Sequence, residues 1–336
     1  MPIPGAAYSE PPLSPHIPLV DTHHHFWGEG HFGAARFGSF LPEDFIATVG
    51  SSGHRLAATV YVDCGWAFRG SGPEHLRCVG ETEYVETVAG QFASTDSPAG
   101  QLCAGIVGRA DLMLGDAVAD VLEAHLEASP SRFRGIRELV AHDPDAYQAL
   151  KIPPGKLLDA RFRAGFGRLA PLGLSCDLLC AHGMLDDVVG LARAFPDTSI
   201  ILDHLAGPVG IGRFSGKRQE VLANWRNRIE ILARFPNISI KLSGVGADVM
   251  GFGWHHGGSA PDSATVADAI SPYIHAAVDA FSPSRCMFGS NFPVDRQSFN
   301  YGVMWNAFKR AATRYSNEEQ RQLFLGAAAR IYRLVL

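Results

Sequence analysis

The sequence predicts a single-domain α/β protein with the (β/α)8 TIM-barrel fold, and three observations favour it. Short apolar runs rich in β-branched residues alternate with segments of helical period along the 336 residues. These runs are apolar throughout, which is typical of parallel strands covered by helices. Segments leading from helix to strand are short, whereas several leading from strand to helix are long and rich in Gly, Trp and His. Because barrels build their active sites from the loops after the strands, one face is expected to carry the function.

Eight apolar runs are the expected strands. They span residues 18–22, 56–63, 102–108, 133–139, 174–179, 199–203, 238–243 and 286–290. A doubly wound parallel sheet is the alternative, but no glycine-rich phosphate-binding fingerprint follows the first run. We therefore expect one barrel domain over residues 17–336, preceded by a loose N-terminal arm over residues 1–16.

The segments between the strands have the periodicity of amphipathic helices. One apolar face is formed by Val118, Val121, Leu122, His125 and Leu126. Two later helix starts carry local signals. Ser271-Pro272 predicts an N-cap followed by a first-turn proline. Ser316 and Glu319 predict a capping box.

Charge and composition limit the class of partner. The net charge is −5 and Lys and Arg do not cluster, which argues against nucleic acid or an acidic membrane surface as main partner. No apolar run approaches the roughly 20 residues that a bilayer span needs. The six cysteines are scattered without zinc-ribbon or redox spacing, so we expect a cytoplasmic protein. A small molecule is the expected partner.

Three consecutive histidines follow the first apolar run. In an extended segment alternate side chains share a face, so His23 and His25 point the same way. Neutral imidazole nitrogens are good metal ligands and proton carriers. The pair therefore predicts a site for a metal ion or a polarised water at the end of this strand.

Further polar side chains fall at or just after the other predicted strands, and a barrel would bring them to one pocket. They are Asp63, Arg134, Arg137, His182, Asp203, His204, Lys241, Ser243, Asn291 and Asp295. Each has a structural alternative. His182 and His204 could be satisfied core histidines. Arg137 could hold an ion pair at the rim, and Lys241 could lay its stem along apolar surface.

The long loops carry candidate contacts to the substrate. Trp27 and Trp66 are among the aromatic residues that indicate a flat or aromatic substrate, with anchoring of the loops against the barrel as the alternative. His255 lies in a Gly-rich loop, where exposure to solvent is the default and contact with substrate the functional interpretation.

Taken together, these motifs resemble the amidohydrolase-related (amidohydrolase 2) branch of the amidohydrolase superfamily. The matching segments are Val20-Asp21-Thr22-His23-His24-His25-Phe26-Trp27, Phe133-Arg134-Gly135-Ile136-Arg137, Leu202-Asp203-His204 with Gly207-Pro208, Ile240-Lys241-Leu242-Ser243-Gly244 and Met287-Phe288-Gly289-Ser290-Asn291-Phe292-Pro293-Val294. They extend from residue 20 to the C-terminal helix. The resemblance implies a barrel hydrolase of the lactonase-like branch, with decarboxylases of hydroxybenzoates in related branches.

The resemblance also implies site residues. It assigns His23, His25 and His182 to metal-binding histidines and Asn291 to the acidic position of the eighth strand. Asn291 departs from the family pattern, because an amide cannot act as a base near neutral pH. Two possibilities follow for the cofactor: one divalent metal ion, Zn²⁺ or Mn²⁺, or no metal. A site without metal is possible because three neutral histidines and an amide carry no negative charge to balance a divalent cation.

The leading hypothesis is hydrolysis of a small lactone or cyclic ester by a water held among the metal-position histidines. His182, His204 or Asp203 would remove the proton of this water. Arg137, with Arg134, would bind an anionic group or the developing oxyanion.

The remaining predicted substrate contacts are Trp27, Trp66, Lys241 and His255. The alternatives are metal-dependent decarboxylation of an aromatic carboxylic acid and binding of a ligand without catalysis. We expect an anionic or aromatic substrate and a homodimer.

Overall fold

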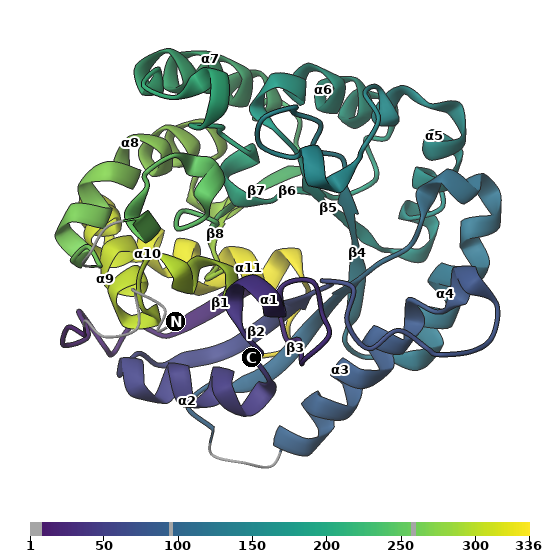
Figure 1. Ribbon diagram of the computed structural model, residues 1–336, viewed down its shortest axis with the longest axis horizontal. Coiled ribbons are helices and arrows are strands. Elements are labelled where there is room, and N and C mark those ends of the chain that lie inside the picture. The colour runs from purple at the N-terminus through teal and green to yellow at the C-terminus, as the bar shows by residue number, and fades with distance from the viewer. Residues whose placement is uncertain (1–8, 94–96, 257–259) are drawn as a thin grey trace.

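Eight parallel strands form one sheet in sequential order, and the helices surround it (Figure 1). The computed structural model describes residues 9–93, 97–256 and 260–336. The strands are β1 (Leu19–His24), β2 (Leu56–Val62), β3 (Gln101–Gly108), β4 (Phe133–Leu139), β5 (Ser175–Leu179), β6 (Ile200–Leu202), β7 (Ile238–Leu242) and β8 (Cys286–Phe288). The predicted barrel is confirmed, and every strand lies within two residues of its predicted bounds.

The barrel closes between its first and last strands just beyond the end of β8. The backbone N–H of Asn291 donates to the carbonyl of His23 at 2.7 Å. The N–H of His25 donates to the carbonyl of Phe292 at 2.8 Å. These two bonds join the histidine motif of β1 directly to the segment that carries Asn291.

Eleven α-helices are found in the described ranges. They are α1 (Ala34–Phe37), α2 (Pro42–Ser52), α3 (Val79–Phe92), α4 (Val118–Ala128), α5 (Ala160–Phe166), α6 (Leu185–Ala194), α7 (Arg218–Leu232), α8 (Ser263–Phe281), α9 (Tyr301–Ala311), α10 (Asn317–Arg321) and α11 (Ala327–Ile331). The apolar face predicted for α4 is buried, apart from half-buried Leu126. The capping box of Ser316 and Glu319 is confirmed at the start of α10.

The helix start predicted at Ser271-Pro272 is wrong. Pro272 lies inside α8, which begins nine residues earlier with Asp262 as its N-cap. The Asp262 carboxylate accepts a hydrogen bond from the N–H of Thr265 at 2.8 Å. The buried face of α8 continues on both sides of the proline, so packing outweighs the one backbone hydrogen bond that Pro272 cannot make.

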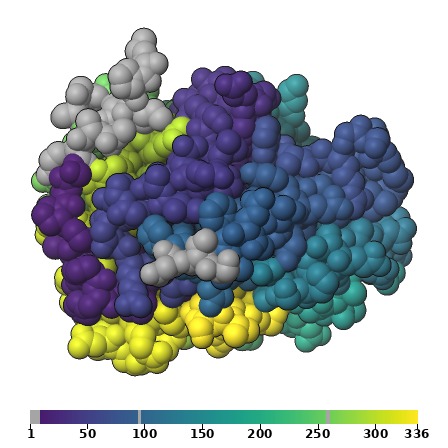
Figure 2. Space-filling view, turned by 90° about the horizontal axis from the view of Figure 1, so that it is seen from below, coloured from purple at the N-terminus to yellow at the C-terminus, as the bar shows by residue number. Residues whose placement is uncertain are grey.

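The end of the chain closes the foot of the barrel, where the strands begin. Ile331 and Tyr332 pack with interior residues such as Val20, Val60 and Met287. Figure 2 shows the yellow C-terminal residues beside the blue first third of the chain. The hydroxyl of Tyr332 donates to Asp177 Oδ2 at 2.6 Å, inside the barrel.

The described part of the N-terminal arm is attached to the barrel. The Glu10 carboxylate accepts from the N–H of Ser263 at 2.7 Å, and the N–H of Leu13 donates to Asn306 Oδ1 at 2.7 Å. Lys309 donates to the carbonyl of Leu13 at 2.9 Å. Residues 9–16 are therefore not loose, and residues 1–8 lie outside the described ranges. Within those ranges, no helix combines the length and hydrophobicity that a bilayer crossing requires.

Removal of the Tyr332 hydroxyl is expected to destabilise the fold. Tyr332→Phe takes a hydrogen bond from a fully buried carboxyl group, so the free energy of unfolding should fall by about 1.5–3 kcal/mol. Tyr315→Phe is the matched control, because the buried Tyr315 hydroxyl has no hydrogen-bond partner in the described part of the chain. Urea unfolding of both variants measures the difference, and equal losses would contradict the role of Tyr332.

Candidate active site

Three histidines meet at the carboxyl ends of β1 and β6. The ring of His23 lies 4.8 Å from that of His25 and 4.4 Å from that of His204. His24 points away from them and stacks on Phe45 of α2 at 4.4 Å. The alternation expected of an extended segment therefore holds, and a short loop after β6 adds the third ring.

A buried lysine lies beneath these rings. Lys241 Nζ is 2.5 Å from Asp177 Oδ2, 3.1 Å from Asp203 Oδ1 and 3.2 Å from Nδ1 of His23. All four side chains are fully buried. Burial raises the pKa of Asp177 to about 6, against the lowering effect of Lys241. Burial also raises the pKa of Asp203, but the charges of Lys241 and His23 outweigh this effect. They hold the pKa of Asp203 well below its usual range. Asp203 is therefore an ion at neutral pH and a weak base.

His25 is held in one orientation by the end of β2. Its Nδ1 lies 2.7 Å from the carbonyl of Val62, so Nδ1 carries the proton and Nε2 keeps a lone pair. Burial, and then the charge of Arg137, hold the pKa of His25 well below its usual range. Arg137 Nε is 3.5 Å from Asp63 Oδ2, and Arg109 Nε is 3.0 Å from Asp63 Oδ1. The neutral ring of His25 thus lies near the guanidinium of Arg137, and the buried carboxylate of Asp63 holds that guanidinium in place.

His204 stands on a strained turn. His204, Leu205 and Ala206 have φ values of +51°, +58° and +57°, a conformation that costs L-residues energy. At Gly207 an added Cβ would lie 1.8 Å from the carbonyl oxygen of Cys180, so only glycine fits there. Nδ1 of His204 lies 2.9 Å from Ser243 Oγ. Burial lowers the pKa of His204 to about 4, so the ring is neutral at pH 7.

Asn291 is fixed by a second carboxyl group. Its Nδ2 donates to Asp295 Oδ1 at 2.8 Å, and the N–H of Gly246 donates to Asp295 Oδ2 at 2.8 Å. Burial raises the pKa of Asp295 to about 7. Asn291 itself has φ +54°. The amide group is thereby held in place, and its carbonyl oxygen remains an acceptor.

Two predicted residues lie elsewhere. Arg134 near the start of β4 donates to the carbonyl of Ser131 at 2.6 Å, so it belongs to the foot of the barrel. The structure does not bring Arg134 to Arg137, because the two residues are three apart and a strand places them on opposite faces. His182 accepts from the N–H of Val209 at 3.2 Å and packs 4.8 Å from the ring of Phe214. In the described part of the chain no contact joins His182 to His23.

The loop residues have structural partners. Trp27 is buried, donates to the carbonyl of Gly38 at 2.9 Å and stacks 6.0 Å from His25. Trp66 lies 6.1 Å from the ring of His31. His255 Nε2 is 3.1 Å from Asp248 Oδ1, in the loop between β7 and α8.

Sequence reasoning did not find Asp177, Arg109 and Tyr332. Asp177 could have been suspected, because a carboxylate in the middle of an apolar strand is rare without a buried partner.

The structure offers one donor group for a metal ion among these rings. His23, Asp203 and His204 bring ligand atoms within 4.8 Å of one another. Nε2 of His23 and both oxygens of Asp203 have no hydrogen-bond partner among the described residues. This set shares only His23 with the predicted set of His23, His25 and His182. Lys241 is shared between Asp177 and Asp203, so it offsets only part of the negative charge that Asp203 offers a divalent cation.

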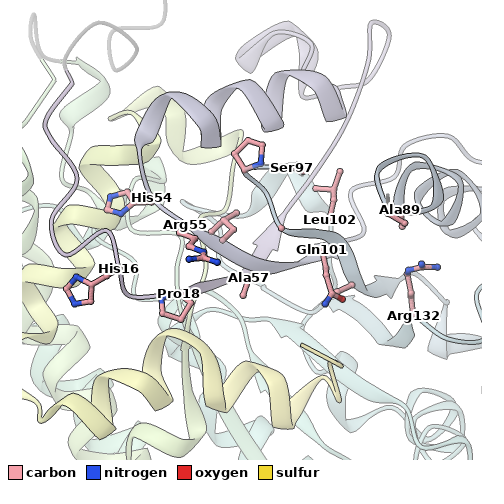
Figure 3. A pocket seen from close by; sticks show the side chains of 15 residues that line it. His16, Pro18, His54, Arg55, Ala57, Ala89, Ser97, Gln101, Leu102 and Arg132 are labelled. Atoms are coloured by element: carbon pink, nitrogen blue, oxygen red, sulfur yellow. The ribbon is translucent and has the colours of Figure 1, made fainter. Parts of the chain in front are cut away.

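A cavity of about 660 Å³ shares Arg137 with this site, and none of the three histidines belongs to its described lining. Arg109 and Arg137 line it, together with apolar residues such as Phe68, Leu114 and Ile152. Its size is that of a small-molecule site. A larger cavity of about 1060 Å³ opens at the foot of the barrel, where Arg55, His54 and Gln101 line it (Figure 3). None of the predicted substrate contacts belongs to that second cavity's described lining.

Comparisons with known proteins show the family and support the barrel fold. The sequence profile of the family described as Amidohydrolase matches residues 20–334. A protein of Sinorhizobium fredii, named "Uncharacterized protein y4mH", is 32% identical over 96% of this chain and 98% of its own length. An L-fucono-1,5-lactonase of Burkholderia ambifaria is 28% identical over 94% of this chain and 95% of that enzyme. An amidohydrolase of Burkholderia multivorans, solved with bound zinc, has a TM-score of 0.71 and 25% identity, covering 94% of this chain and 99% of that one.

Asn291→Asp is expected to make stability depend on pH. The new carboxyl group would lie beside Asp295, whose pKa is already raised to about 7, and would raise it further. A carboxyl group with a raised pKa in the folded state favours folding at low pH, and stability falls as pH rises through that pKa. Urea unfolding should show a larger loss at pH 8 than at pH 5. Asn300→Asp, at the N-cap of α9, is the control and should show little loss. Equal losses at both pH values would refute the pairing.

Proposed function

This chain belongs to the amidohydrolase family, and from that premise we propose that it opens a small lactone or related cyclic ester by attack of water. The observation that carries the proposal is the meeting of neutral His23, His25 and His204 beside Arg137. The likeness to L-fucono-1,5-lactonases over nearly the whole chain supports a sugar lactone as the substrate class.

His204 is our assignment for the general base. Ser243 can accept the proton of Nδ1, which leaves the lone pair on Nε2. His204 is only partly buried, so Nε2 is accessible to a water molecule. Asp203 is a weaker base than His204, because Lys241 and His23 hold its pKa well below its usual range. His182 is excluded because its contacts lie elsewhere. General-base assistance of this kind contributes about 10²–10⁴ in rate.

The reaction then follows from the side chains. Nε2 of His204 takes a proton as the water oxygen bonds to the lactone carbonyl carbon. Arg137 stabilises the oxyanion that forms, and Asp63 holds the guanidinium in place. Collapse breaks the bond between the acyl carbon and the ring oxygen, and His204 returns the proton to that oxygen. The product is an open-chain hydroxy acid.

His23 and His25 orient the attacking water in this scheme. Both are neutral, because burial holds their pKa values well below the usual range. Nε2 of His23 is buried without a hydrogen-bond partner in the described chain, so it is available to a water molecule or a metal ion. A metal ion held by His23, Asp203 and His204 would supply Lewis-acid polarisation. Because Lys241 competes with such an ion for Asp203, we derive the reaction from the side chains alone.

Decarboxylation of an aromatic acid has weaker support. The solved 5-carboxyvanillate and 2,6-dihydroxybenzoate decarboxylases share only 14% and 11% identity with this chain, so their likeness shows the fold alone. Turnover of a panel of sugar lactones and aromatic lactones, before and after treatment with a chelator, separates the two reactions. Lactone hydrolysis that survives chelation supports our proposal, whereas metal-dependent release of CO₂ from hydroxybenzoates would overturn it.

His204→Gln should abolish most lactone turnover. We expect kcat to fall by about 10²–10⁴, because glutamine cannot accept the proton of water. His16→Gln is the control, since His16 is exposed near the foot of the barrel. Circular dichroism checks that both variants fold, and undiminished turnover in folded His204→Gln would reject the assignment.

Arg137→Met and Arg134→Met form a second pair on one strand. Loss of Arg137 should lower kcat by about 10²–10³, the usual effect of losing an oxyanion donor. Arg134→Met should leave kcat unchanged, because Arg134 lies at the opposite end of β4. Equal effects of the two changes would contradict the placement of the substrate.

A further inference from the structure

The loop between β7 and α8 carries a second group of ligating side chains. We propose that Asp248, His255 and His256 bind a divalent transition-metal ion, Zn²⁺ by preference, at the mouth of the barrel. Their ligand atoms lie within 4.8 Å of one another, and the two imidazole rings are 3.9 Å apart. No member of this group belongs to the His23 cluster, so the site is separate from the residues assigned to the reaction.

The contact between Asp248 and His255 differs from a hydrogen bond. His255 Nε2 lies 3.1 Å from Asp248 Oδ1, yet the atoms are not aligned for donation, and Nε2 is buried without a hydrogen-bond partner in the described chain. Two ligand atoms that lie close together without forming a hydrogen bond can both coordinate the same metal ion. A metal ion would satisfy them, because a neutral imidazole and a carboxylate are both ligands of Zn²⁺.

Two tight turns bring the three residues together. The N–H of Gly251 donates to the carbonyl of Asp248 at 2.8 Å, and that of His256 donates to the carbonyl of Gly253 at 3.0 Å. Gly251 has φ +69°, and an added Cβ would lie 2.2 Å from the carbonyl oxygen of Gly210. The loop is thus folded against the β6–α7 segment in a conformation that presents Asp248 beside the histidines.

The charges around the group permit a cation. Arg36 Nη2 lies 3.3 Å from Asp248 Oδ2, which leaves Oδ1 for the ion. Arg36 also donates to Gln297 Oε1 at 3.0 Å, and its side chain is 54% exposed, so water and salt screen its charge. Lys241, by contrast, is fully buried beside Asp203. Arg36 is therefore a weaker competitor for a cation than a buried ammonium group is.

Two histidines and one carboxylate define the class of metal. Imidazole ligands favour Zn²⁺, Ni²⁺ and Cu²⁺ over Mg²⁺ and Ca²⁺, which prefer oxygen. Three protein ligands leave a fourth position for water. Because Gly246 of the same loop donates to Asp295, which holds Asn291, an ion here would stabilise a loop that supports the catalytic segment.

Zinc titration of the full chain tests the site. Protein freed of metal by dialysis against a chelator is titrated with Zn²⁺ by isothermal titration calorimetry. His256→Ala and Asp248→Asn should bind one equivalent fewer than wild type, or bind it at least tenfold more weakly. His16→Ala is the matched control and should bind as wild type does. Thermal unfolding without metal verifies that each variant is folded.

The outcomes separate this site from the active site. If the His23 cluster binds no zinc, wild type should take up one equivalent and His256→Ala none. Anomalous diffraction from a zinc-soaked crystal should place a peak among Asp248, His255 and His256. Unchanged zinc stoichiometry and affinity in both loop variants would overturn the proposal, whatever the lactonase assays show.

Discussion

The ammonium group of Lys241 is the constraint on which the barrel interior depends. It lies within 3.2 Å of two carboxylate oxygens and an imidazole nitrogen, all fully buried. Removing one partner from such a group leaves an uncompensated charge, at a typical cost of about 3–5 kcal/mol. Lys241 lies on β7, and its three partners come from β1, β5 and the end of β6, so one cation fixes how four strands present their side chains.

This arrangement determines the protonation states above it. Lys241 keeps Asp203 ionised, and its positive charge adds to burial in keeping His23 neutral. Arg137 has the same effect on His25 from the other side. The result is a set of neutral imidazoles with free lone pairs, flanked by buried Lys241 and half-buried Arg137. The two cations favour the stabilisation of an anion. Asn291 fits this balance, because an aspartate there would face the carboxyl group of Asp295.

The strands and the β1 histidines could be predicted because both depend on local rules. Apolar runs and the two-residue alternation of an extended chain specify which side chains share a face, as His23 and His25 do. Arg134 lies apart from Arg137, because residues three apart on a strand point to opposite faces. His182 follows β5 as predicted, but the turn after the strand determines its direction, and local sequence does not encode that turn.

Contacts between residues far apart in the chain could not be predicted from the sequence. Asp177 and Tyr332 are 155 residues apart, and neither has a neighbour in sequence that signals the contact. Pro272 predicted a helix start by a sound local rule, but the packed face of α8 outweighed it. The strained turn at His204 belongs to the same class, since Ser243 and the backbone of Cys180 restrain it from other strands. Left-handed conformations at His204 and Asn291 cost energy that the surrounding barrel must offset. Strain at these two positions therefore indicates that the closed barrel, rather than the local sequence, positions the groups to which we assign the reaction.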